Sequence, residues 1–209
     1  MTMSHYVSDD QLTKTSLTQL IELAIKIKTE PQNYSTALAG KSVAMIFEKP
    51  SLRTHVSFDI GINKLGGHAL YLGQQNGKLG ARERISDVAK NLSCWADAIV
   101  ARVFEHSAIT ELAEHSKVPV INALCDTYHP CQSLADFVTL AEHFDDLSKL
   151  KLAYVGDGNN VSNSLMLMAA ILGTDFTLVC PEGHGPDAHI LAKAQALAEE
   201  NGSKLLLTS

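Results

Sequence analysis

Candidate anion-binding groups follow the first apolar run of the sequence. The run SVAMIF ends at Phe47, and the sequence continues EKPSLRTHVSF. Ser51 can cap a helix that begins there, and its first turn would then hold Ser51, Leu52, Arg53 and Thr54. Backbone N–H groups at a helix N-terminus, together with hydroxyls and a guanidinium, are suited to binding a phosphate. The alternative is that Ser51 only caps the helix and that Arg53 is a solvated side chain.

Three further polar residues come at or just beyond the ends of predicted strands. Arg102 directly follows ADAIVA, and His129 and Gln132 lie in DTYHPCQ, where Pro130 suits the first turn of a helix. An imidazole and a carboxamide held together there could donate hydrogen bonds to a carbonyl oxygen that gains negative charge. The alternatives are a surface arginine, a capping histidine and a surface glutamine.

The segment GDGNNVSNS, which contains Asn160, follows the apolar run LAYV. Gly156 and Gly158 do not complete a GxGxxG motif, because Val161 stands at the third glycine position, so we expect no NAD site. Asn160 and its neighbouring asparagines offer uncharged amides that suit a zwitterionic small molecule. His184 and His189 lack the spacing of a zinc site, and we expect no metal.

Strands and helices alternate along the sequence that must position these residues. Apolar runs predict strands over residues 42–47, 68–72, 96–102, 118–122, 152–157, 175–180 and 204–209. Helical spacing predicts helices over residues 9–28, 51–65, 83–94, 109–115, 129–144, 162–172 and 187–200. The pattern predicts an α/β fold, a parallel sheet with helices on both faces, and ligand sites at the carboxyl ends of the strands.

A break in the pattern at DDLSKLK predicts a domain boundary near residues 145–150. We expect a complete first domain over residues 1–145. The second, over residues 150–209, has only three predicted strands, which is few for an independent doubly wound domain. We therefore expect the second domain to be incomplete.

Composition excludes several classes of protein. The 209 residues are 45% hydrophobic with a net charge of -6, which excludes disorder and any bulk attraction to nucleic acid or an anionic membrane. The sequence contains no run of about 18 apolar residues, so we predict no membrane-spanning helix. The 4 cysteines form no CxxC pair, which favours a reduced compartment, and we expect a cytoplasmic protein.

The combination of SLRT after a strand, an arginine after a later strand and HPCQ at a helix start resembles the aspartate/ornithine carbamoyltransferase family. HPCQSLADFVTLAEHF and VGDGNN look most like its ornithine carbamoyltransferase members. The resemblance implies that Ser51–Thr54 bind the phosphate of carbamoyl phosphate, Leu52 through its backbone. It implies that Arg102, His129 and Gln132 contact the phosphate and carbonyl oxygens of that substrate, and that Asn160 binds ornithine.

The resemblance also implies transfer of the carbamoyl group to the side-chain amine of L-ornithine, giving L-citrulline and phosphate without a metal or organic cofactor. Arg53, Arg102 and His129 would be the catalytic residues. Family members are trimers or larger homo-oligomers, and the loop GQQNGKLG looks like the one that reaches a neighbouring site. Lys78 in that loop stands where the family has glutamine, and could still bind phosphate as a point charge.

Two family motifs of the acceptor side, DxxxSM and HCLP, do not occur in these 209 residues. We therefore expect the chain by itself to bind carbamoyl phosphate or phosphate weakly, with negligible turnover. One alternative is a carbamoyltransferase with another acceptor, such as aspartate. Another is a non-catalytic fragment that binds phosphate or supports oligomerisation.

Overall fold

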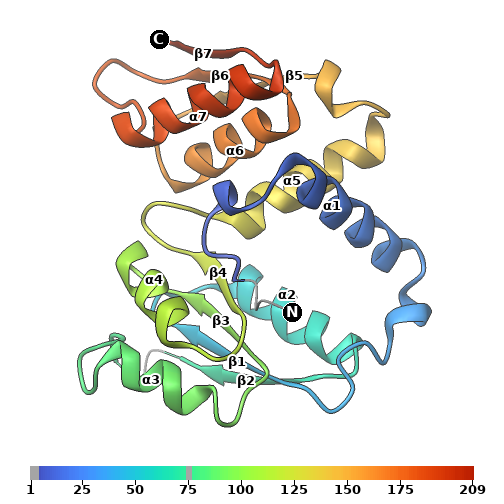
Figure 1. Cartoon of the computed structure of the whole chain (residues 1–209), viewed down its shortest axis with the longest axis vertical. Coiled ribbons are helices and arrows are strands. Elements are labelled where there is room, and N and C mark those ends of the chain that lie inside the picture. Colours follow the sequence, from blue (N-terminus) through green and yellow to red (C-terminus); the bar gives the residue numbers. More distant parts are fainter. Residues whose placement is uncertain (1–4, 74–76) are drawn as a thin grey trace. The chain divides into compact units, whose positions relative to one another are not determined.

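The computed structural model describes residues 5–73 and 77–209, which form two compact units (Figure 1). The first unit comprises the described residues up to Val7 together with Thr29–Asp126. The second comprises Ser8–Lys28 and Thr127–Ser209. Each unit contains its own parallel sheet, of four strands in the first and three in the second, as the α/β pattern predicts.

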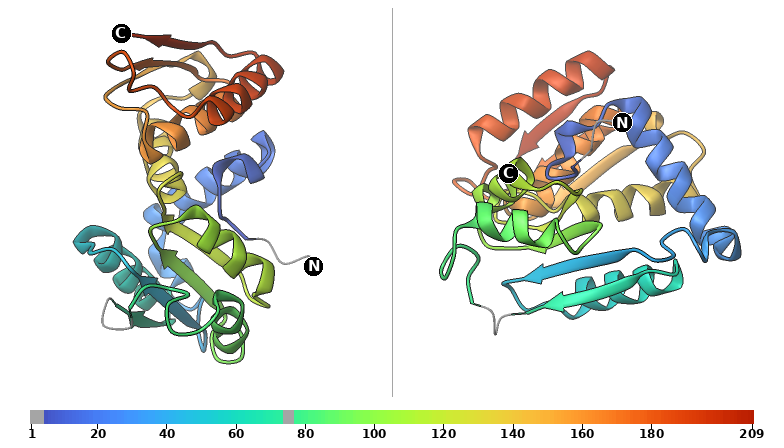
Figure 2. Two further views of the ribbon diagram at one scale, coloured as in Figure 1. Left: turned by 90° about the vertical axis from the view of Figure 1, so that its left-hand side faces the viewer. Right: turned by 60° about the horizontal axis from the view of Figure 1, so that its bottom comes forward.

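The sheet of the first unit has the strand order β2-β1-β3-β4, and every neighbouring pair is parallel. Its elements are η2 (Pro31–Tyr34), β1 (Ser42–Phe47), α2 (Leu52–Lys64), β2 (His68–Leu72), α3 (Ile85–Leu92), β3 (Ala98–Arg102), α4 (His106–His115) and β4 (Val120–Leu124). Helix α2 lies on one face, and α3 and α4 lie together on the other (Figure 2). Helices on both faces explain why β1 and β3 are continuous apolar runs.

The carboxyl ends of β1 and β3 lie side by side. The register pairs Phe47 at the end of β1 with Arg102 at the end of β3. On one face of β1, Val43, Met45 and Phe47 pack against Ile62 of α2. Buried apolar contacts therefore hold α2 against β1, and the short connection after Phe47 places the start of α2 at the same edge of the sheet as the end of β3.

The second unit carries the sheet β5-β6-β7, also parallel. Its elements are η1 (Asp9–Gln11), α1 (Lys14–Thr29), α5 (Pro130–His143), η4 (Leu147–Lys149), β5 (Lys151–Val155), α6 (Asn160–Leu172), β6 (Asp175–Val179), α7 (Ala188–Asn201) and β7 (Leu205–Thr208). Helix α6 is buried from Ser162 to Leu172 and contacts α5, α7 and η1. The segment Ser8–Lys28 and α5 thus belong to this unit, although the sequence-based division places residues 1–145 together.

The predicted first helix begins too early. Residues 9–11 form a 3-10 turn, and the α-helix begins at Lys14. Ser16 N–H donates to Thr13 Oγ1 at 3.2 Å, and Thr13 N–H donates to Ser16 Oγ at 2.9 Å, a reciprocal cap that starts α1 there. The remaining predicted elements agree with the structure to within about three residues at each end.

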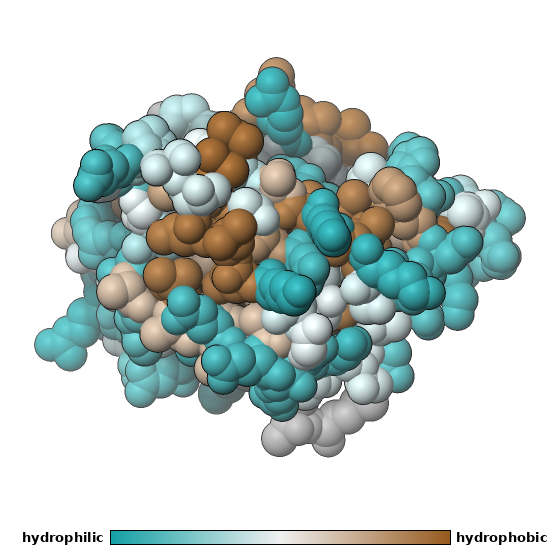
Figure 3. Space-filling view, turned by 90° about the horizontal axis from the view of Figure 1, so that it is seen from above, coloured by the Kyte–Doolittle hydropathy of each residue, from teal (hydrophilic) through white to brown (hydrophobic). Residues whose placement is uncertain are grey.

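One face of the second sheet is left open. Helix α6 packs on β6 and α7 on β7, while Val155 is 79% exposed and Leu206 56% exposed. Figure 3 shows apolar side chains gathered on the face of the molecule that carries this sheet. In the described part of the chain, no helix is long and apolar enough to cross a membrane.

Candidate functional site

The first turn of α2 is capped as the sequence predicts. Ser51 has an extended backbone, and its Oγ accepts a hydrogen bond from Thr54 N–H at 3.3 Å. The other early N–H groups of a helix have no partner within the helix, and the helix dipole adds positive potential there. Arg53 is exposed, and Leu52 is 79% exposed, so the Leu52 side chain contributes no packing to this turn. This end of α2 can receive an anion.

Arg102 meets the same turn from the neighbouring strand. Its Nη1 donates to Thr54 Oγ1 at 3.3 Å, so the structure brings together two residues that lie 48 positions apart. Burial lowers the pKa of Arg102, but the ordinary value of an arginine is so high that the guanidinium stays charged at neutral pH. The buried Nε atom has no hydrogen-bond partner among the residues that the structure describes. A bound anion would supply that partner.

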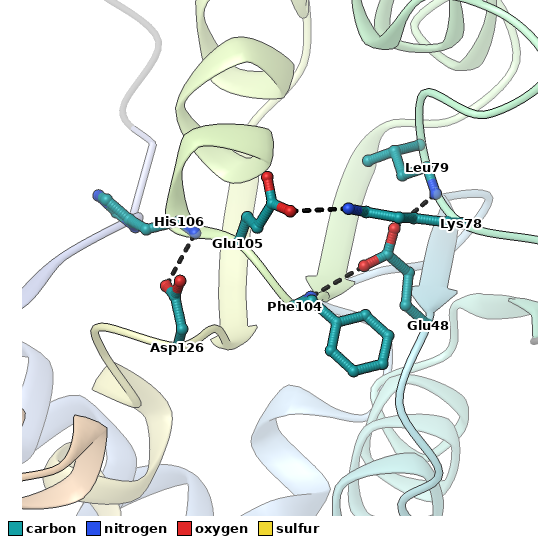
Figure 4. Close-up of polar contacts among 7 residues, drawn as sticks. All are labelled: Glu48, Lys78, Leu79, Phe104, Glu105, His106 and Asp126. Atoms are coloured by element: carbon teal, nitrogen blue, oxygen red, sulfur yellow. Dashed lines mark hydrogen bonds and ion pairs between the residues drawn. The ribbon is translucent and has the colours of Figure 1, made fainter.

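Glu48 is a component of this region that the sequence did not single out. It follows β1 and is only 6% exposed. One carboxylate oxygen accepts from Phe104 N–H at 2.8 Å, and the other accepts from Leu79 N–H (Figure 4). Glu48 therefore ties the glycine-rich loop to the chain that follows Arg102. A charged residue directly after a buried strand was the available signal, because such a residue needs partners when it is buried.

Lys78 lies in that loop and pairs within its own chain. Its Nζ is 2.7 Å from Glu105 Oε1, and both side chains are more than half exposed (Figure 4). The hydrogen bond from Lys78 to Glu105 raises the pKa of Lys78. Residues 74–76 of the predicted interface loop lie outside the described residues. A role of Lys78 toward a neighbouring subunit stays a prediction.

A cavity of about 450 Å³ adjoins the loop, between the ends of β1 and β2 and helix α3. Phe47, Glu48, Leu79 and Trp95 are among the residues that line it. Ser51–Thr54 and Arg102 do not line this cavity, so the cavity is distinct from the predicted anion site.

The other predicted site residues belong to the second unit. His129 precedes α5, and its backbone N–H donates to Ser164 Oγ of α6 at 2.9 Å. Gln132 lies in the first turn of α5 and donates from Nε2 to Asp136 Oδ1 at 2.9 Å. Asn160 is the first residue of α6, after the N-cap Asn159. The structure therefore joins the starts of α5 and α6 through His129.

Gly158 has a packing role in the loop between β5 and α6. A Cβ at this position would lie 2.2 Å from the backbone of Gly185 and Pro186. The Gly158 N–H donates to the His184 carbonyl at 2.8 Å, which keeps the two loops in contact. The close approach of two backbones accounts for this glycine without a dinucleotide. Within residues 5–73 and 77–209, no group of His, Cys, Asp and Glu side chains is arranged to hold a metal ion.

Two family models match almost the whole chain. Residues 4–142 match "Aspartate/ornithine carbamoyltransferase, carbamoyl-P binding domain", and residues 148–209 match "Aspartate/ornithine carbamoyltransferase, Asp/Orn binding domain". The chain belongs to the aspartate/ornithine carbamoyltransferase family. Among the predicted site residues, Asn160 falls in the second match and the others fall in the first.

Individual relatives agree with this assignment. The chain is 63% identical over 207 residues to an ornithine carbamoyltransferase of Shewanella oneidensis, covering 99% of this chain and 69% of the relative. It resembles the solved ornithine carbamoyltransferase of Pyrococcus furiosus with a TM-score of 0.95 at 41% identity, covering 98% of this chain and 66% of that one. A mitochondrial ornithine carbamoyltransferase of Coccidioides immitis gives a TM-score of 0.92 at 39% identity, with coverage of 99% and 69%. The chain thus spans about two thirds of the length of these relatives.

Proposed function

We propose that this chain is the part of an ornithine carbamoyltransferase that binds carbamoyl phosphate and contributes to binding of L-ornithine. In that reaction the side-chain amine nitrogen of L-ornithine bonds to the carbamoyl carbon of carbamoyl phosphate, the bond from that carbon to the bridging oxygen breaks, and phosphate leaves. The amine loses a proton, and L-citrulline forms. The observation that carries the proposal is the contact of Arg102 with Thr54 at the N-terminus of α2, with Arg102 Nε still to be satisfied.

The proposed roles follow from the chemistry of each group. The phosphate would be bound by Ser51, the Leu52 backbone, Arg53, Thr54 and Arg102. Their cationic and N–H donors would stabilise the charge that develops on the leaving group. His129 and Gln132 would donate to the carbamoyl carbonyl oxygen, and Asn160 would bind the amino acid. Residues 1–145 would then form the carbamoyl phosphate-binding domain, and residues 150–209 part of the ornithine-binding domain.

We further propose a homotrimer or larger homo-oligomer. Leu52, Val56 and Ile60 follow one another at helical spacing along α2, and all three are at least 42% exposed. An exposed apolar stripe of this kind is suited to contact with a second copy of the chain. A cytoplasmic location and a place in arginine metabolism belong to the same proposal.

Calorimetric titration of the chain with carbamoyl phosphate and with inorganic phosphate tests the anion site. We expect both to bind, and Arg53→Ala to weaken both by about tenfold or more, because hydrogen bonds to charged groups are the strong ones. Arg84→Ala is the matched control, since Arg84 is an exposed arginine at the start of α3. Equal binding by wild type and Arg53→Ala would contradict the proposal.

The acceptor is tested by thermal unfolding with L-ornithine or L-aspartate in the presence of phosphate, because a ligand that binds the folded state raises the melting temperature. We expect stabilisation by ornithine. Stabilisation by aspartate alone would instead favour a carbamoyltransferase with an aspartate acceptor.

A further inference from the structure

Ser164 connects α6 to the residue that starts α5. Its side chain is fully buried, and its Oγ accepts a hydrogen bond from the His129 N–H at 2.9 Å across 35 residues of sequence. His129 is the N-cap of α5, yet its own side chain makes no capping hydrogen bond. A residue of α6 therefore holds the backbone from which the imidazole of His129 extends.

The Ser164 hydroxyl is oriented in turn by the buried carboxyl group of Asp9. It donates to Asp9 Oδ2, and Ser133 Oγ of α5 donates to Asp9 Oδ1 at 2.7 Å. Asp9 is 1% exposed. A hydroxyl has one hydrogen and two acceptor lone pairs, so donation to Asp9 leaves Ser164 Oγ as an acceptor for the His129 N–H.

The hydrogen bonds form a series in which the His129 N–H donates to Ser164 Oγ and the Ser164 hydroxyl donates to Asp9. These hydrogen bonds join η1, α5 and α6. Buried hydrogen bonds that polarise one another hold their members in one arrangement. Loss of the central hydroxyl would release the His129 backbone and leave Asp9 Oδ2 without this donor.

We propose that Ser164 is a positioning residue for His129, whose hydroxyl, held by Asp9, fixes the backbone from which the imidazole reaches the carbamoyl group. This role rests on the proposed function, in which His129 donates to the carbamoyl oxygen. The phosphate end of the same substrate is assigned to Arg53, Arg102 and the start of α2. Displacement of His129 should therefore weaken carbamoyl phosphate binding more than inorganic phosphate binding.

The test is the ratio of the affinities for carbamoyl phosphate and inorganic phosphate, measured by titration of the whole chain. We expect Ser164→Ala to lower this ratio about five- to tenfold, the effect of losing one buried hydrogen bond. Ser164→Thr, which keeps the hydroxyl, should restore it. Ser133→Ala is the matched control, because it removes a hydroxyl from the same carboxylate but does not touch the His129 N–H, and the ratio should stay unchanged.

His129→Ala and hydrogen exchange separate the two proposals. If His129→Ala loses the preference for carbamoyl phosphate while Ser164→Ala keeps it, the role of Ser164 is overturned. If the wild-type chain shows no preference for carbamoyl phosphate over inorganic phosphate, the proposed role of His129 in the function fails. Hydrogen exchange of the His129 amide then tests the positioning by itself: faster exchange in Ser164→Ala supports it, and unchanged exchange overturns it. Ser164→Cys, similar in size but a weak acceptor, serves the same comparison if the alanine variant does not fold.

Discussion

Arg102 is partly buried and Asp9 is fully buried, and burial shifts their pKa values in opposite directions. Burial lowers the pKa of Arg102, but its ordinary value is so high that the charge persists and remains ready for an anion. Asp9 meets two serine hydroxyls, and burial raises its pKa to about 7, with a smaller contribution from the neighbouring Asp10 charge. Asp9 therefore titrates near neutral pH.

This shift predicts that stability falls as pH rises. The folded state holds the Asp9 proton up to a pH of about 7, whereas the unfolded chain loses it near 3.8. The stabilisation is complete below the unfolded value and is lost as pH rises through the folded value. We expect the free energy of unfolding to drop by on the order of 2 kcal/mol from pH 5 to pH 8 through this one group. Thermal unfolding by circular dichroism across this range measures the drop.

Asp9→Asn should remove that part of the pH dependence, because an amide does not titrate. Asp10→Asn is the control: Lys193 holds the Asp10 carboxylate and lowers its pKa, so Asp10 stays ionised throughout the same range. A slope that is unchanged in Asp9→Asn would show that another group is responsible.

The connection between β1 and α2 also organises the neighbouring loops. Glu48 accepts backbone hydrogen bonds from Leu79 and Phe104, which come from two separate segments. The nearby ion pair of Lys78 with Glu105 is exposed, and exposed pairs contribute little to stability. Glu48 is therefore the stronger constraint on the glycine-rich loop.

Glu48→Ala should speed hydrogen exchange at the amides of both Leu79 and Phe104, and should lower stability by about 1–3 kcal/mol because two donors lose their acceptor. Glu48→Gln has one carbonyl oxygen left, so it should protect only one of the two amides. Exchange measured by NMR distinguishes these cases. Glu105→Ala should leave both amides protected; if it exposed them as strongly as Glu48→Ala, the ion pair would be the true constraint.

The open sheet of the second unit affects the behaviour of the whole chain. Val155 and Leu206 point to the same face, because the register pairs Thr177 with Leu206 and Val155 with Val179 and side chains alternate along each strand. Among the described strands of this sheet, β5 and β7 are the outer ones. Exposed apolar patches and unpaired edges promote association between chains.

Val155→Lys should therefore reduce concentration-dependent association and the binding of a hydrophobic dye, measured by light scattering and by fluorescence. Phosphate affinity should not change, since Val155 lies outside the predicted anion site of the first unit. Leu23→Lys is the control, because Leu23 is an exposed leucine of α1 at 43% exposure, away from the sheet. If both substitutions reduced association equally, added surface charge and not the apolar face of the sheet would explain the reduction.

Local signals predicted much of the fold. The run SVAMIF followed by Ser51 predicted β1 and the capped start of α2, and the structure confirms both. Such features depend on residues within one strand or one helical turn. The start of the first helix was wrong, since acidic residues at 9 and 10 suggested a helix N-terminus, whereas Thr13 provides the cap.

The sequence by itself determined the order of strands and helices, the capped start of α2 at Ser51 and the resemblance to a family, because these depend on neighbouring residues. Only the tertiary structure decided which distant groups meet. Arg102 reaches Thr54 because β1 and β3 are adjacent in a parallel sheet. Asp9 bonds to Ser133 and Ser164 across 124 and 155 residues of sequence. A buried polar group must find its partner wherever the packing of helices and strands places one, and that packing is a property of the folded chain.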